Sequence, residues 1–115
     1  MIKMNLNNTH FITDRWPLEP SLPTIIFIHG AGSSKTFWKP LIEQLNKDFN
    51  AIAFDLPGHG ENSNDGMNSI EDYSRNIEEC IRAINPPYPV PCGLSMGGAI
   101  TLTLIINSDI NFKAA

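Results

Sequence analysis

The chain has 115 residues, of which 42% are hydrophobic and 17% are charged, the balance of a globular domain rather than of a disordered segment. Its formal net charge of −4, with no basic run, argues against nucleic acid or an anionic membrane as the main partner. No stretch approaches the ~18 apolar residues of a membrane span, and residues 1–8 lack the apolar core of a signal peptide, so we expect a cytoplasmic protein. Without a secretion signal, Cys80 and Cys92 are expected to be free, buried thiols.

The amino-terminal residues predict a β-hairpin followed by an extended connector. Residues 2–6 and 10–13 flank Asn7-Asn8, a pair of residues typical of turns. Three prolines between residues 16 and 23 favour an extended connection without regular structure.

Strands and helices then alternate. Residues 24–28 and 50–55 are almost continuously apolar, which is typical of parallel strands buried on both faces. Helical spacing predicts a first helix over residues 36–46, with an apolar face formed by Phe37, Trp38, Leu41, Ile42 and Leu45. A second helix is predicted over residues 70–84, because a start similar to a capping box precedes it at Ser69-x-x-Asp72 and two prolines follow it.

The last predicted elements are a short strand at residues 90–92 and a helix over residues 96–107. Pro89 and Pro91 cannot donate to a sheet ladder, so this strand is weaker than a central position requires. The order of elements predicts a mostly parallel sheet with right-handed crossovers. We therefore expect residues 1–115 to form part of one α/β domain, a three-layer sandwich with an N-terminal β-hairpin.

Residues 93–97 have the pattern G-x-S-x-G and lie between the last predicted strand and the last predicted helix. In such a turn the serine, Ser95, lies on a strained backbone with its hydroxyl exposed. The residues two before and two after it approach closely, and glycine at positions 93 and 97 avoids their collision. The small residues Gly98 and Ala99 are expected to keep the first turn of the helix thin, so that the helix lies close to its strand. The pattern therefore predicts a nucleophile elbow.

Two further motifs follow predicted strands: His29-Gly30, and the sequence Asp-Leu-Pro-Gly-His-Gly at residues 55–60, with Ser63 beyond it. Together with the G-x-S-x-G pattern, and in this order, they closely resemble the α/β-hydrolase fold family, in the branch with esterases, lactonases and carbon–carbon bond hydrolases. The resemblance covers nearly the whole chain and implies the N-terminal portion of that fold.

The resemblance also implies roles for particular residues. Ser95 would be the catalytic nucleophile, and the backbone N–H groups of Ala31 and Met96 would form the oxyanion hole. The Met96 N–H also lies at a predicted helix N-terminus, which favours negative charge. The family's sheet order would bring the loops of Ala31 and Ser95 together at the topological switch point, where ligands bind. Motif or loop-shaping roles are implied for His29, Gly30, Asp55, Gly58, His59, Gly60, Gly93 and Gly97.

In this family the triad acid and histidine follow the serine far downstream. The sequence ends at Ala115, about where a further strand is expected, and family members are usually at least twice as long. We therefore expect the other triad members in a C-terminal part that this sequence lacks. The 115-residue chain alone is expected to be inactive, and it would pair with a complementing C-terminal fragment or form a homo-oligomer.

The leading hypothesis is a serine-dependent hydrolase that acts on a small ester, lactone or related acyl substrate. Two alternatives stay open: a carbon–carbon bond hydrolase or lyase on the same fold, and an inactive truncated product or interaction fragment. His29, His59 and Asp55 are weaker candidates for base or acid, since their motifs give them loop-shaping roles. No cofactor or metal is expected, because neither metal-ligand spacing nor a phosphate-binding loop occurs in the sequence.

Overall fold

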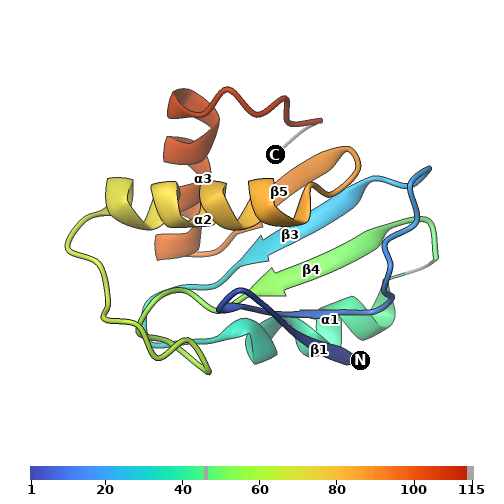
Figure 1. Cartoon of the computed structure of the whole chain (residues 1–115), viewed down its shortest axis with the longest axis horizontal. Coiled ribbons are helices and arrows are strands. Elements are labelled where there is room, and N and C mark those ends of the chain that lie inside the picture. Colours follow the sequence, from blue (N-terminus) through green and yellow to red (C-terminus); the bar gives the residue numbers. More distant parts are fainter. Residues whose placement is uncertain (46, 114–115) are drawn as a thin grey trace.

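The computed structural model describes residues 1–45 and 47–113 and arranges them around one five-stranded sheet (Figure 1). In chain order the elements are β1 (Ile2–Leu6), β2 (Thr9–Thr13), β3 (Thr24–Ile28), the 3₁₀ helix η1 (Lys35–Trp38), α1 (Lys39–Gln44), β4 (Asn50–Phe54), α2 (Ile70–Ile84), β5 (Pro89–Gly93) and α3 (Met96–Asn107). The strands lie in the order β1-β2-β4-β3-β5. Strand β3 is parallel to both β4 and β5, and the N-terminal hairpin is antiparallel, which confirms the predicted sheet.

Helices cover both faces of the sheet, because successive side chains of β3 and β4 point to opposite faces. On one face, α2 and α3 pack over Ile26, Ile28, Ile52 and Phe54. On the other face, η1 and α1 pack over Phe27, Ala51 and Ala53. Both strands are therefore buried on two sides, and the prediction of a three-layer α/β sandwich is confirmed.

The first helix differs from its predicted range of residues 36–46. It begins as η1 and becomes α-helical at Lys39, and Pro40 supplies no N–H for an α-helical bond to Thr36. It ends at Gln44, and residue 46 lies outside the described residues. The physical reason for the difference is thus a proline inside the predicted helix, which favours a 3₁₀ first turn.

The predicted apolar face of this helix is only partly buried. Trp38 and Ile42 are in the core and Leu45 is half-buried, so the buried positions follow helical spacing. Phe37 and Leu41, in contrast, are 53% and 45% exposed. A short helix whose first turn is 3₁₀ presents a narrow stripe to the sheet, and the prediction of Phe37 as a core residue is wrong.

The helices α2 and α3 have the predicted bounds. The Ser69 hydroxyl caps α2 by accepting a hydrogen bond from the Asp72 N–H at 3.1 Å. At the other end of α2, Asn85 takes a left-handed conformation with φ of 50°, directly before the two prolines. No helix in the described part of the chain has the length and apolar character needed to cross a membrane.

Strand β5 accommodates its two prolines because the backbone N–H and C=O groups of successive residues point alternately toward β3 and toward the opposite edge of the strand. The Leu94 N–H donates to Ile28 O at 3.3 Å, so even-numbered residues direct their backbone groups toward β3. Pro89 and Pro91 therefore face the other edge, where Pro89 O accepts from the Lys113 N–H at 2.8 Å. A missing N–H on that side costs no bond to β3. The expectation that the prolines weaken this strand does not hold for its pairing with β3.

Cys80 and Cys92 are free thiols, as predicted, although each is half-buried rather than fully buried. Burial raises the pKa of both thiols above the usual value. Since the thiolate is the nucleophilic form, neither cysteine is activated for reaction at neutral pH.

Candidate active site

Ser95 lies on a sharp turn that joins β5 to α3. Its backbone has φ of 58° and ψ of −120°, a combination that costs energy for any residue except glycine. The residue is exposed, and its hydroxyl makes no capping hydrogen bond to the first turn of α3. Strained backbone and a free hydroxyl at the N-terminus of a helix are what a nucleophile elbow requires.

The two glycines of the pattern are required by close backbone contacts. A Cβ atom at Gly93 would lie 2.0 Å from Gly97 O, and a Cβ atom at Gly97 would lie 2.0 Å from Ile28 O. Gly98 differs, because a Cβ there would meet its nearest neighbour, Gly93 O, at an ordinary 3.6 Å. The packing of α3 against β3 and β5 thus requires glycine at positions 93 and 97, whereas position 98 has room for a methyl group.

The loop after β3 touches the elbow because β3 and β5 are neighbours in the sheet. A Cβ atom at Gly30 would lie 3.3 Å from Ser95 Cβ and 3.8 Å from Ser95 Oγ. The hydrogen bonds of the described residues do not use the backbone N–H groups of Ala31 and Met96. The structure therefore places two free N–H donors on the two segments that meet at Ser95.

The orientation of the Gly30–Ala31 peptide is set by hydrogen bonds to its oxygen. Gly30 O accepts from the Ser33 N–H at 3.2 Å and lies 2.7 Å from His29 Nδ1. In a trans peptide the C=O and N–H bonds point in opposite directions. The Ala31 N–H is therefore directed away from these two donors.

His29 is fully buried, and both of its ring nitrogens are engaged. Nε2 accepts a hydrogen bond from the Leu56 N–H at 3.1 Å, so the proton of the neutral ring is on Nδ1, which donates to Gly30 O. Burial is the largest of the effects that lower the pKa of His29 and favour this neutral form. With neither nitrogen available, this geometry gives His29 no route to the proton of Ser95.

We expect the protonation of His29 to reduce the stability of the fold at mildly acidic pH. Its pKa in the folded state lies below the unfolded value of 6.5, so the unfolded chain binds the proton more readily, and the contribution of His29 is lost as pH falls below 6.5. The melting temperature of the full-length protein should therefore fall more between pH 7 and pH 5 than that of a His29→Gln variant. Equal pH dependence in both proteins would contradict this interpretation.

His59 belongs to the loop that follows β4. Its Nδ1 lies 3.0 Å from Pro57 O and, since a carbonyl only accepts, Nδ1 donates this bond. The ring lies 5.1 Å from the ring of His29 and 6.4 Å from that of Tyr73, measured between centroids. His59 is thus held by its own loop and by the rings of His29 and Tyr73. No hydrogen bond among the described residues joins it to Ser95.

Asp55 directly follows β4, and its carboxylate binds both the loop after β3 and the loop after β4. Its Oδ2 accepts from the Glu61 N–H at 2.9 Å, a bond within its own loop, as expected from the sequence. Its Oδ1 also accepts from the Lys35 N–H at 2.8 Å, and Lys35 Nζ lies 2.6 Å from Oδ2. Gly60 has φ of 53°, and a Cβ there would lie 2.2 Å from Asp55 Oδ1. The carboxylate is therefore fully used, without a histidine partner.

Lys35 is the residue of this region that the sequence did not reveal. Its side chain is only 2% exposed, and its Nζ also contacts Glu61 Oε1 at 2.9 Å. Burial alone would lower the pKa of Lys35, but hydrogen bonds to Asp55 and Glu61 raise it overall, so the ammonium stays charged. Hydrogen bonds from Lys35 and then Lys3 lower the pKa of Glu61 to about 2. No sequence pattern marked a lysine in this loop as buried.

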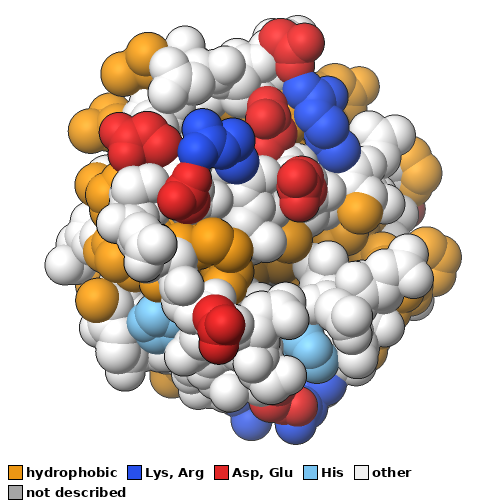
Figure 2. All heavy atoms as spheres, turned by 60° about the vertical axis from the view of Figure 1, so that its left-hand side comes forward, with side chains coloured by type: hydrophobic (Ala, Val, Ile, Leu, Met, Phe, Trp, Pro, Cys, Tyr) orange, Lys and Arg blue, Asp and Glu red, His pale blue; other side chains and the backbone are white. Residues whose placement is uncertain are grey.

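Figure 2 shows the side of the molecule toward which the parallel strands run. Charged side chains gather in the upper part of this view and again at its lower edge, and two histidine side chains lie in the lower half with an acidic side chain between them. Leu94, next to Ser95, is 50% exposed, so an apolar surface adjoins the serine. Among the described residues, no three His, Cys, Asp or Glu side chains are grouped so that they could hold a metal ion.

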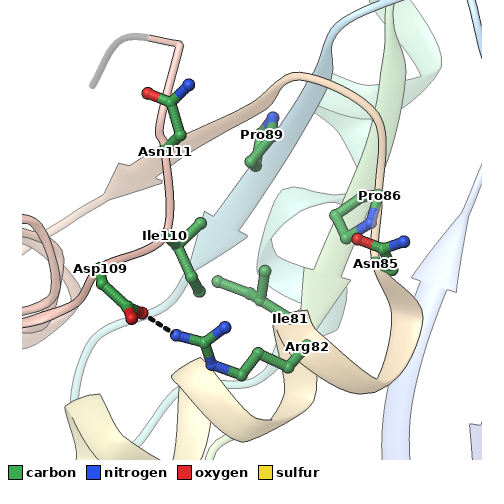
Figure 3. A pocket seen from close by; sticks show the side chains of 8 residues that line it. All are labelled: Ile81, Arg82, Asn85, Pro86, Pro89, Asp109, Ile110 and Asn111. Atoms are coloured by element: carbon green, nitrogen blue, oxygen red, sulfur yellow. Dashed lines mark hydrogen bonds and ion pairs between the residues drawn. The ribbon is translucent and has the colours of Figure 1, made fainter.

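A cavity of about 310 Å³ lies elsewhere on the chain (Figure 3). Its walls come from the end of α2, the start of β5 and the segment after α3, and an ion pair between Arg82 and Asp109 lies at its side. Pro89, at the start of β5, is part of this wall, whereas Ser95 follows the other end of the same strand. The cavity is therefore not part of the candidate active site.

Comparisons with known proteins find enzymes that are similar to this chain in sequence and in fold. The chain is 33% identical over 91 residues to a pimeloyl-[acyl-carrier protein] methyl ester esterase of Pseudoalteromonas atlantica, which covers 79% of this chain and 34% of the relative. It is 30% identical over 80 residues to a 2-succinyl-6-hydroxy-2,4-cyclohexadiene-1-carboxylate synthase of Yersinia pseudotuberculosis. These aligned residues cover 70% of this chain and 29% of the relative. A crystal structure of an N-acyl homoserine lactonase with N-butanoyl homoserine superposes with a TM-score of 0.76 at 27% identity, over 92% of this chain and 40% of that chain.

This chain spans only about a third of the length of these curated relatives. Residues 25–113, which include all three motifs, match the sequence model of a family described as "Alpha/beta hydrolase family". The fold and the match over most of its length show that the chain belongs to the alpha/beta hydrolase family.

Proposed function

We propose that this chain carries the nucleophile and the oxyanion hole of a serine-dependent hydrolase that acts on a small ester, lactone or related acyl substrate. The observation that carries the proposal is the strained, exposed Ser95 in contact with the loop of Gly30 and Ala31. Two of the similar proteins, the methyl ester esterase and the homoserine lactonase, are named for substrates with an acyl C–O bond.

In this proposal Ser95 Oγ attacks the carbonyl carbon of the substrate, and the carbonyl oxygen becomes an oxyanion. The Ala31 and Met96 N–H groups, which have no hydrogen-bond acceptor among residues 1–45 and 47–113, donate hydrogen bonds to that oxyanion. The C–O bond to the alcohol then breaks to leave an acyl group on Ser95, and water releases the acid. The exposed Leu94 would contact an apolar part of the acyl group.

A serine hydroxyl also needs a base to accept its proton. Within the described residues, His29 uses both ring nitrogens, and His59, whose Nε2 is left as an acceptor, has no hydrogen bond to Ser95. We therefore propose that the histidine and the acid of the triad belong to a part of the protein outside these residues. The activity assigned here is that of the full-length protein.

A second candidate is a lyase or carbon–carbon bond hydrolase on the same fold. The observation that favours it is the similarity to the cyclohexadiene-carboxylate synthase, since that enzyme is not named as a hydrolase. Mass spectrometry of the full-length protein during turnover would distinguish the two. An acyl group trapped on Ser95 supports the ester hydrolase, and turnover without any such adduct supports the second candidate.

The Ser95→Ala variant tests the proposal directly. In the full-length protein we expect it to reduce kcat for a short-chain chromogenic ester by a factor on the order of 10⁴–10⁶, because the nucleophile is lost. A fluorophosphonate probe should label the wild type but not the variant. Ser21→Ala, a change at an exposed serine of the connector, is the matched control and should leave both readouts unchanged. Ester turnover that survives Ser95→Ala would refute the proposal, and a wild type with neither activity nor labelling would favour an interaction fragment.

A further inference from the structure

We propose that Lys35 is a positioning residue that holds the loop of Ala31 in place beside Ser95. The inference rests on the proposed function, because the position of this loop matters for catalysis only if the Ala31 N–H stabilises an oxyanion.

The contacts of Lys35 join the end of this loop to the segment after β4. Both its backbone N–H and its ammonium bind the Asp55 carboxylate, at 2.8 and 2.6 Å, and the ammonium also binds Glu61 at 2.9 Å. The side chains of Lys35 and Asp55 are 2% and 0% exposed. The bonds between Lys35 and Asp55 are therefore shielded from water and hold Lys35 in one arrangement, whereas the side chain of Glu61 is 50% exposed.

The start of the same loop is bound to the same segment. His29 Nε2 accepts the Leu56 N–H, and residue 56 directly follows Asp55. The loop from residue 29 to residue 35 is thus fixed at both ends to a single short stretch of chain. A shift at either end would move the peptide that carries the Ala31 N–H.

Between its two ends the loop has little packing of its own. Ala31 and Gly32 are exposed, and a Cβ atom at Gly32 would meet no atom within 4 Å. The one backbone bond inside the loop is the Ser33 N–H to Gly30 O bond at 3.2 Å. The position of Ala31 therefore depends on the hydrogen bonds to Gly30 O and on the anchors at residues 29 and 35, rather than on packing of its own side chain.

A buried ion pair is a costly way to stabilise a fold, because apolar residues of similar volume often do so equally well. A lysine offers a different property, since its ammonium can donate to two carboxylates in fixed directions. The ammonium of Lys35 donates in this manner to the carboxylates of Asp55 and Glu61. The geometry thus points to orientation of the loop as the contribution of this lysine.

The experiment compares Lys35→Met with Lys39→Met, a change at an exposed lysine four residues later, in the full-length protein. The first variant should lower kcat for a short-chain ester by about 10- to 100-fold with KM within about threefold, because a misplaced donor weakens only the transition state. Its affinity for a trifluoromethyl ketone, whose adduct with Ser95 has an oxyanion, should fall by a similar factor. Lys39→Met should change neither value, and Lys35→Arg should recover part of the kcat.

A purely structural role would reduce the fraction of folded enzyme and leave the kcat per titrated active site unchanged. If Lys35→Met does not fold, the double variant Lys35→Met/Asp55→Asn removes the unpaired charge, and a folded double variant with low kcat supports the proposal. Wild-type kcat and ketone affinity in either folded variant overturn it, as does failure of both variants to fold. If Ser95→Ala retains activity, the proposed function fails first and this inference fails with it.

Discussion

Replacing Gly97 with alanine is expected to disable the elbow and to destabilise the fold. The added Cβ would lie 2.0 Å from Ile28 O; the backbone fixes the position of a Cβ, and Ile28 O is itself a backbone atom, so neither atom can rotate away. The first turn of α3 would have to move off β3, at a cost of about 3 kcal/mol or more in the free energy of unfolding. Because Ser95 moves with that turn, kcat should fall by about 100-fold or more. Denaturant unfolding and ester turnover of the full-length variant measure the two effects.

Gly98→Ala is the matched control, one residue further along α3. Its Cβ would meet Gly93 O at 3.6 Å, an ordinary contact. Alanine is also the better helix former, so this variant should keep its activity and gain up to about 1 kcal/mol in stability. If Gly97→Ala and Gly98→Ala behave alike, close packing at the elbow is not what requires the glycine.

Asp55→Ala should produce the largest loss of stability in the charged network. The change leaves the buried ammonium of Lys35 with Glu61 as its remaining carboxylate partner, and it also removes the acceptor of two backbone N–H groups. Removal of one partner from a buried pair costs about 3–5 kcal/mol. Urea unfolding of the full-length protein at pH 7 would show this as a lower midpoint with an unchanged slope.

The control for this prediction is Asp65→Ala, in the exposed part of the same loop. An exposed aspartate contributes little, so we expect a change within about 0.5 kcal/mol. If Asp55→Ala costs less than about 1 kcal/mol, water must reach the ammonium, and the Lys35–Asp55 pair does not anchor the loop.

Features that depend on neighbouring residues could be predicted from the sequence. The bounds of β3, α2 and α3 follow from apolar runs, helical spacing, the Ser69 cap and the prolines after residue 85, and each is found as predicted. The approach of residues 93 and 97 follows from the turn that the G-x-S-x-G pattern requires, and the structure shows it. Local steric and hydrogen-bonding preferences determine all of these features.

Other features were decided only by the tertiary structure. Pro91 is tolerated because the register of β5 turns it away from β3, and a strand prediction does not contain that direction. Phe37 is exposed because a 3₁₀ turn rotates it away from the sheet.

The same holds for the buried charges of the candidate site. Lys35 and Asp55 are 20 residues apart, and they pair because two parallel strands place the loops that follow them at one edge of the sheet. His29 takes its protonation state from Leu56 for the same reason. The sequence determined the elements and the serine of this protein, whereas the environment of that serine depends on contacts between distant segments, which have no local signature.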